Sequence, residues 1–311
     1  MNRTVFVRRT LSAVLVLAFV LALGVPFAAA QDGEGRVVTD FLGREVTIAA
    51  PPERVVGLSA SITEMLYAAG VTPVGVTEGI EFPEAAAELP TFGSGYQLDL
   101  EALAALEPDL IIANAQLQAQ LVGQLESIAP TVFVMTLTAA DVPANIRTIG
   151  HVTWQDTTAE YVAEAQEGLL DFVELTAPEE GPSILIIVGT LGQPNFGKSS
   201  TYLGDMAAML GATNIADAEE DAGPFPGYTQ LSAEQVLAED PDIIFTVTRG
   251  APGAPPIPDE MADDPVWSSL TAFEEGRVYE MDNRLFLESP GPRFVEALKE
   301  LYTLFYGGEE M

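Results

Sequence analysis

Short apolar runs alternate with helical patterns along most of the chain. The run Leu110–Ala113 is apolar throughout and Ile243–Val247 is apolar except for Thr246, as strands are when helices cover both faces of a parallel sheet. Two further runs, Val55–Leu58 and Ile184–Val188, each precede another helical pattern. Because strands that alternate with helices form parallel sheets, the pattern predicts an α/β fold.

Part of this pattern occurs twice. Residues 98–112 and 231–245 match at a fixed offset of 133 positions. Each copy contains a short helical segment, then a Pro-Asp turn, then a buried strand. The helical segment is expected to end before the proline, because proline disfavours continuation of a helix. Glu101 and Glu234 hold equivalent places near the start of the two helices. The repeat predicts two lobes of similar plan.

The segment between the two copies has a helical pattern without a strand. It begins at Asp141, and Gly150 is expected to interrupt it before a second helix runs from Asp156 to Thr176. A helix of about twenty residues spans roughly 30 Å, the width of a small lobe. We therefore predict an α/β fold of two Rossmann-like lobes with parallel-rich sheets, joined by one long rigid α-helix, with a ligand cleft between the lobes. The expected boundaries are residues 36–155 for the N-terminal lobe, 156–178 for the interdomain helix and 179–311 for the C-terminal lobe.

The first thirty residues have the pattern of a signal peptide. Arg3, Arg8 and Arg9 precede the apolar run Leu11–Phe27, and the small residues Ala28–Ala30 follow. A retained anchor stays open as an alternative, because about seventeen apolar residues are the lower limit for spanning a bilayer. We expect the protein in the periplasm or on the extracytoplasmic face, exported by a cleavable signal peptide through the Sec or the twin-arginine route.

Composition and charge exclude several classes of protein. There are 46 acidic and 13 basic residues, a formal net charge of −33 and no cysteine. Such an acidic chain does not suit nucleic-acid binding, which needs clustered Lys and Arg. Without cysteine there are no disulfides, thiolate metal sites or cysteine-linked lipid anchors. Mutual repulsion of the acidic surface favours a monomer.

Several motifs occur in an order that indicates a family. They are Ser59-Ala60-Ser61, Gly75-Val76-Thr77, Leu89-Pro90 with Gly93, Pro108-Asp109, Gly211 with Asn214-Ile215, Pro241-Asp242, Val266-Trp267 and Gly276-Arg277-Val278-Tyr279. From about Arg36 to Tyr306 the chain resembles the substrate-binding proteins of iron-chelate and vitamin B12 ABC importers. The resemblance implies capture of a metal chelate, such as a ferric siderophore, or of a corrinoid, and its delivery to a permease dimer. Haem-binding members have a tyrosine where Ser94 stands, which argues against direct ligation of haem iron.

In open α/β sheets, ligands bind at loops that follow the carboxyl ends of the strands. The candidates there are Ser61, Phe82, Tyr96, Phe225, Tyr228, Arg249 and Phe286. Tyr228 stands where the resemblance places a tryptophan against the corrin, and aromatic side chains offer rigid area to bulky ligands. Arg249 is the first candidate for an anionic chelate, followed by Lys198 and Arg293. Core packing for the aromatic residues and surface ion pairs for the basic ones are the alternatives.

The resemblance also implies that Glu101 and Glu234 meet arginines on the two permease subunits. Exposed opposite charges steer encounter and fix orientation. The alternative is local, since a carboxylate in the first turn of a helix stabilises the helix dipole by about 0.3–1 kcal/mol. Ser232 with Gln235 predicts a capping box in the second copy.

An enzyme is the rival class. A Ser-His-Asp hydrolase would have to use His151, the one histidine of the chain, which lies in the helical connection. The string Gly192–Ser199 matches a phosphate-binding loop, GxxxxGKS, but Pro194 removes an amide that the loop would use. We expect neither catalysis nor a cofactor or metal of the protein's own. An extracellular ligand sensor or interaction module remains an alternative to the importer component.

Overall fold

The structure is a computed structural model that describes residues 35–178, 180–223, 226–249, 253–288 and 290–307. Its first parallel sheet has the strand order β3 (Val55–Gly57), β6 (Leu110–Asn114) and β7 (Thr131–Val134). Strands β3 and β7 are buried throughout, as the continuous apolar runs predict. The predicted signal peptide lies outside the described residues.

A second sheet repeats this plan and adds to it. The parallel strands β8 (Ser183–Thr190), β12 (Ile243–Thr248) and β13 (Val278–Glu280) stand in the same relative order. On the other side of β8, β9 (Gln193–Gly197) and then β11 (Tyr228–Thr229) run antiparallel to their neighbours. The short β10 (Thr213–Asn214) pairs in parallel with the start of β8. We call the parts built around the first and second sheets the N-terminal lobe and the C-terminal lobe.

The repeat in the sequence therefore corresponds to a repeat in the fold. Helix α2 (Leu100–Ala105) precedes β6, and α8 (Ala233–Glu239) precedes β12, at matching places in the two lobes. The predicted strands and their parallel pairing are confirmed. The segment after β8 forms the antiparallel strand β9, which the sequence pattern does not predict, so the second sheet is mixed.

The remaining elements cover the sheets and edges. They are β1 (Arg36–Thr39), β2 (Glu45–Ile48), α1 (Ala60–Ala68), η1 (Glu84–Ala86), β4 (Gly93–Ser94), β5 (Gln97–Leu98), α3 (Ala115–Gln118), η2 (Ala119–Leu121), α4 (Val122–Glu126), α7 (Tyr202–Met209), η3 (Ile215–Ala218), α9 (Ile257–Asp263), η4 (Trp267–Ser269), α10 (Thr271–Glu274), the π-helical turn η5 (Arg284–Glu288) and α11 (Phe294–Tyr306). Gly70 and Gly211 follow α1 and α7 with φ angles of 85° and 87°. These positive values suit the residue that follows a helix C-cap, where glycine is favoured. Within the described ranges, no helix has the length and apolar character needed to cross a membrane.

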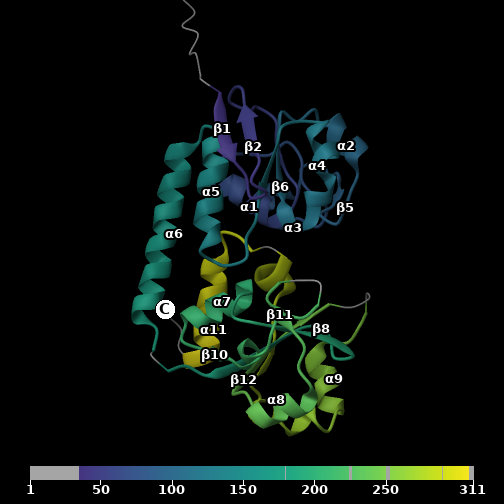
Figure 1. Cartoon of the computed structure of the whole chain (residues 1–311), viewed down its shortest axis with the longest axis vertical. Helices are drawn as coiled ribbons and strands as arrows, with labels where there is room; N and C mark the ends of the chain where they lie inside the picture. Colours follow the sequence, from purple (N-terminus) through teal and green to yellow (C-terminus); the bar gives the residue numbers. More distant parts are fainter. Residues whose placement is uncertain (1–34, 179, 224–225, 250–252, 289, 308–311) are drawn as a thin grey trace, which may run out of the picture. The chain divides into compact units, whose positions relative to one another are not determined.

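Two helices run side by side in the connection between the sheets (Figure 1). Helix α5 spans Asp141–Val152, and α6 spans Asp156–Thr176, as the helical pattern predicts for the second. Gly150 does not interrupt α5, contrary to our expectation. A Cβ at this position would lie 2.1 Å from the Cβ of Ala159 on α6. At Gly150, therefore, α5 and α6 approach too closely to admit a side chain.

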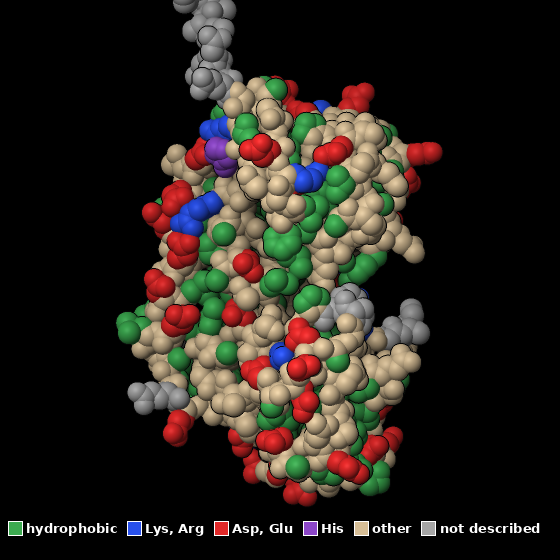
Figure 2. All heavy atoms as spheres, in the orientation of Figure 1, with side chains coloured by type: hydrophobic (Ala, Val, Ile, Leu, Met, Phe, Trp, Pro, Cys, Tyr) green, Lys and Arg blue, Asp and Glu red, His purple; other side chains and the backbone are tan. Residues whose placement is uncertain are grey.

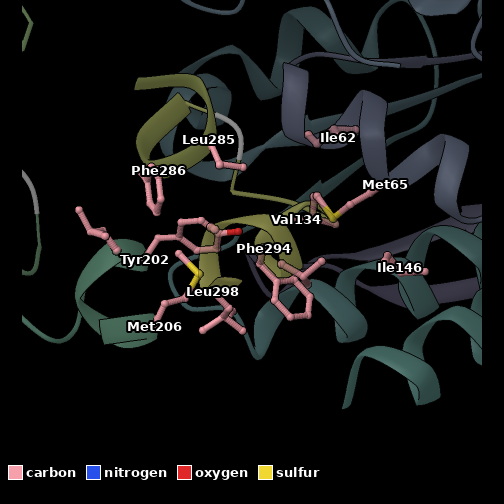
Figure 3. Packing of buried hydrophobic residues seen from close by; sticks show 14 of the residues in the cluster. Ile62, Met65, Val134, Ile146, Tyr202, Met206, Leu285, Phe286, Phe294 and Leu298 are labelled. Atoms are coloured by element: carbon pink, nitrogen blue, oxygen red, sulfur yellow. The ribbon is translucent and has the colours of Figure 1, made fainter. Parts of the chain in front are cut away.

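One hydrophobic cluster continues through both lobes. It joins Ile62 and Met65 of α1 to Met206 of α7 and to Phe294 and Leu298 of α11, all of which are buried (Figure 3). Because packed interiors resist deformation, this shared core and α6 together limit how far the lobes can move apart. The exact lobe boundaries given above remain a prediction.

Candidate functional site

A cavity of about 910 Å³ opens between residues of the two lobes. We call it the large compartment. The N-terminal lobe contributes the start of α1, the loop before η1 and the β4–β5 turn, and the C-terminal lobe contributes the chain from Asp282 to Arg293 and Glu300 of α11. Several of these segments follow the carboxyl ends of β3 and β13, where an α/β fold places ligands. Its size suits a bulky small molecule.

A second cavity of about 480 Å³, the small compartment, adjoins the first, since Tyr96 and Leu117 line both. Its other walls come from the β8–β9 hairpin, Tyr228 of β11, Arg249 after β12, and Leu287. A third hollow of about 110 Å³ lies beyond Tyr228 and reaches Phe286. The compartments together form a crevice that takes walls from both lobes.

Three of the residues singled out from the sequence meet in the small compartment. The Arg249 guanidinium donates to the Tyr96 hydroxyl across the cleft, with Nη2 3.4 Å from Oη, and lies 5.8 Å from the centre of the Tyr96 ring. The Tyr96 side chain is 63% exposed, so its ring is open to a ligand. Tyr228 is partly buried in the same wall, and burial raises the pKa of its hydroxyl, which keeps it protonated as a hydrogen-bond donor.

The other candidates take different positions. Phe82 is exposed at the large compartment, where the Arg293 guanidinium lies 4.8 Å from its ring centre. Ser61 is buried, with its Oγ 3.0 Å from that of Ser59, and it is Ser59 that lines the compartment. Phe286 belongs to the shared core and only borders the smallest hollow. Phe225 lies outside the described residues.

Sequence reasoning missed the ionic contacts across the large compartment. The buried carboxylate of Glu64 on α1 accepts from Nε and Nη2 of Arg293, at 3.2 to 3.3 Å. Glu81 and Arg284 form a second, more exposed ion pair between the lobes. Arg293 was a candidate cation, but Glu64 precedes it by 229 positions, and nothing in the local pattern at Glu64 indicates this partner.

Burial shifts the protonation of the first of these pairs. Desolvation raises the pKa of Glu64 from 4.5 to about 7, against the opposing effect of Arg293. A carboxyl whose pKa is higher in the folded than in the unfolded state stabilises the fold most below about pH 4.5, and this contribution is lost as the pH rises through 7. Glu64 is expected to make the free energy of unfolding fall by up to about 3 kcal/mol between pH 5 and 8. We expect Glu64→Gln to abolish this fall, measured by urea denaturation at both pH values.

The matched control is Glu239→Gln, which removes one carboxylate from the exposed end of α8. It corrects for the general change in net charge. The Glu239→Gln protein should keep the pH dependence of the unmodified protein. If the Glu64→Gln protein also keeps it, Glu64 does not cause the loss of stability with rising pH.

Glu101 and Glu234 are both exposed, each at the second position of its helix. Asp99 caps α2 by accepting the backbone N–H groups of Glu101 and Ala102. Ser232 and Gln235 form the predicted capping box of α8. Because other side chains cap these helices, and neither glutamate forms an ion pair within the described residues, both carboxylates are available to a partner.

The residues of the two enzyme alternatives, His151 and the string Gly192–Ser199, form neither a triad nor a loop at a helix start among the described residues. His151 contacts Asp156 at 3.4 Å at the junction of α5 and α6, and it does not border the described compartments. The string that matches a phosphate-binding loop lies along the antiparallel strand β9. The ammonium of Lys198 donates to the carbonyl of Glu219 and to Asp221, so it pairs within its own lobe.

Comparison with known proteins agrees with this arrangement. A family model described as "Periplasmic binding protein" matches residues 55–285, about three-quarters of the chain. The Fe(3+)-citrate-binding protein YfmC of Bacillus subtilis is 27% identical, with 93% of this chain and 96% of the relative covered. A vitamin B12-binding protein of Salmonella typhimurium is 30% identical, with 81% and 89% covered.

A solved structure has the same fold. The petrobactin-binding protein YclQ from Bacillus subtilis aligns with a TM-score of 0.75 at 20% identity, over 87% of this chain and 98% of the other. At this identity the likeness concerns the fold alone. It supports the two-lobed α/β arrangement that the sequence predicts here.

Proposed function

The chain belongs to the periplasmic binding protein family, and from this premise we propose that it captures a metal chelate or a corrinoid outside the cytoplasm and delivers it to an ABC importer permease. The observation that carries the proposal is the crevice in which Tyr96 of one lobe meets Arg249 of the other. A bulky ligand in this crevice contacts both lobes at once. We further propose that the segment 1–30 is the cleaved export signal.

The roles of individual residues follow from their positions. Tyr96 and Tyr228 present aromatic area to the ligand, and Arg249 presents a cation to its acceptor atoms. Phe82 offers a further ring at the large compartment. Glu101 and Glu234, equivalent in the two lobes, dock onto the two permease subunits. The duplicated plan supports this pairing, since two equivalent contacts suit a two-fold symmetric partner.

A panel of ligands tests the function. The purified mature chain is heated with cobalamins, haem, ferric citrate and ferric siderophores, and the midpoint of unfolding is recorded. A ligand present at a hundred times its dissociation constant stabilises the fold by about 2.7 kcal/mol. A chelate or corrinoid that raises the midpoint supports the proposal. Stabilisation by none of them, at concentrations up to the millimolar range, contradicts it.

Tyr228→Ala is expected to weaken binding of the ligand identified in this panel. Loss of a partly buried aromatic wall costs about 2 kcal/mol, or about thirtyfold in affinity, measured by calorimetry. Tyr161→Ala removes an aromatic side chain that is 75% exposed on α6, and it serves as the control with unchanged affinity. If the Tyr228→Ala and Tyr161→Ala proteins bind the ligand with equal affinity, Tyr228 does not contribute to the binding site.

A further inference from the structure

The large compartment is more acidic than the chain as a whole. Six of its twenty lining residues are acidic and two are basic, whereas 46 of the 311 residues of the chain are acidic. The acidic six are Glu64, Glu78, Glu81, Asp282, Glu288 and Glu300. Acidic side chains are more frequent than basic ones on the face drawn in Figure 2, but the lining of the compartment is about twice as rich in them as the sequence average. Low-dielectric walls of one charge sign focus the field inside a cleft.

The two arginines of the lining each neutralise one of its six carboxylates, and the other four stay in excess. Arg284 pairs with Glu81, and Arg293 pairs with Glu64. Both guanidinium groups thus already face carboxylates of the opposite lobe. An anionic ligand would have to compete with these carboxylates for them.

Three other carboxylates of the lining lack such compensation. Within the described residues, no ion pair is formed by Glu78, Asp282 or Glu300. Burial, together with the charge of Asp282, raises the pKa of Glu300, so these two groups repel each other. Next to them, the buried Oδ1 of Asn283 has no hydrogen-bond donor among the described residues, and a buried acceptor without a donor is unfavourable.

These groups do not converge on a single point. The described residues contain no cluster of three or more acidic or histidine side chains that could hold a metal ion. Carboxylates spread around a cavity of about 910 Å³ suit an extended positive ligand rather than a bare cation. The small compartment differs, since its lining has no carboxylate and includes Arg249 with the amides of Gln116, Gln193 and Asn195. Arg249 meets the acidic lining only at its edge, where Nη2 lies 3.9 Å from Oε1 of Glu288.

We propose that the large compartment selects the positively charged part of the ligand, a protonated amine or the periphery of a cationic metal complex, while the acceptor-rich part of the same ligand faces Arg249 in the small compartment. This inference rests on the proposed function and gives the charge of its ligand. A donor-rich cation relieves the repulsion between Asp282 and Glu300.

The first test uses an inert trication, hexaamminecobalt(III), as a probe of the compartment. The double variant Asp282→Asn/Glu300→Gln is compared with Glu164→Gln/Asp171→Asn, which neutralises two exposed carboxylates of α6. The amide introduced by Asp282→Asn retains an acceptor for the backbone N–H of Leu285, which the Asp282 carboxylate binds now. By calorimetry at 0.1 M salt, we expect the compartment variant to lose about tenfold in affinity and the α6 variant to keep it. Equal affinities of the two variants would overturn the inference.

The second test uses three iron(III) trishydroxamates with the same metal core. Their pendant group is a protonated amine, a neutral acetamide or a succinamate carboxylate. We expect the amine form to bind about tenfold more tightly than the carboxylate form, with the difference reduced in the Asp282→Asn/Glu300→Gln variant. Tighter binding of the carboxylate form overturns the inference but leaves the proposed function standing. If no chelate or corrinoid binds, the proposed function is contradicted. The affinity of the two double variants for hexaamminecobalt(III) then still tests whether the compartment binds cations.

Discussion

Gly150→Ala is expected to destabilise the protein by about 3 kcal/mol, measured as the free energy of unfolding in urea. The new Cβ would lie 2.1 Å from the Cβ of Ala159, and 3.2 Å from the carbonyl oxygen of Gln155. Neither neighbour can rotate away, because a Cβ is bonded directly to the backbone. Helices α5 and α6 must therefore separate, and both bury side chains in the shared core.

Gly168→Ala is the matched control. Gly168 lies within α6, and a Cβ there would meet no atom within 4 Å. Alanine favours a helix over glycine, so this substitution is expected to stabilise the protein by about 0.5–1 kcal/mol. Opposite signs of the two changes would show that the close contact, and not the loss of glycine as such, controls stability. A Gly150→Ala protein as stable as the unmodified one would contradict the tight approach of α5 and α6.

The sequence was a good guide to the repeated framework. Apolar runs such as Leu110–Ala113 and Ile243–Val247 are buried on both faces. Any strand at the centre of such a sheet needs apolar side chains on both faces, so the run itself is enough to predict the strand. It was a poor guide to β9, because Gly192 and Pro194 are typical of turns. Pro194 is tolerated since it lies opposite Gly189, near the end of the β8–β9 hairpin.

Only part of the candidate site could be predicted from the order of strands and loops in the sequence. Arg249 directly follows β12, as expected from the rule that ligands bind beyond the carboxyl ends of parallel strands. Tyr96 and Tyr228 border the crevice from other positions, the β4–β5 turn and the antiparallel strand β11. The acidic lining was not predicted, since each carboxylate resembles an ordinary solvated charge in a chain with 46 of them. Only the fold brings Glu64 on α1 to Arg293, and only the fold brings Asp282 to Glu300 in one compartment.

The joint substitution Glu101→Arg/Glu234→Arg is expected to reduce ligand uptake by cells at least about tenfold while leaving ligand binding unchanged. Each glutamate lies at the second position of an exposed helix, α2 or α8. Reversing two docking charges replaces attraction to permease arginines by repulsion, which acts on encounter and orientation. Neither residue lines the described compartments, so binding measured by calorimetry should not change. Uptake is followed with labelled ligand in cells that carry the cognate permease.

A control variant, Glu164→Arg/Asp171→Arg, makes the same change in net charge at two exposed carboxylates of α6 and is expected to support normal uptake. The purely local alternative makes a different prediction. If Glu101 and Glu234 serve only the helix dipoles, each substitution costs about 0.3–1 kcal/mol of stability and uptake follows the amount of folded protein. Normal uptake by the Glu101→Arg/Glu234→Arg protein would assign both glutamates to their helices, whereas a loss restricted to this pair would make the repeated helix of each lobe the contact with the transporter.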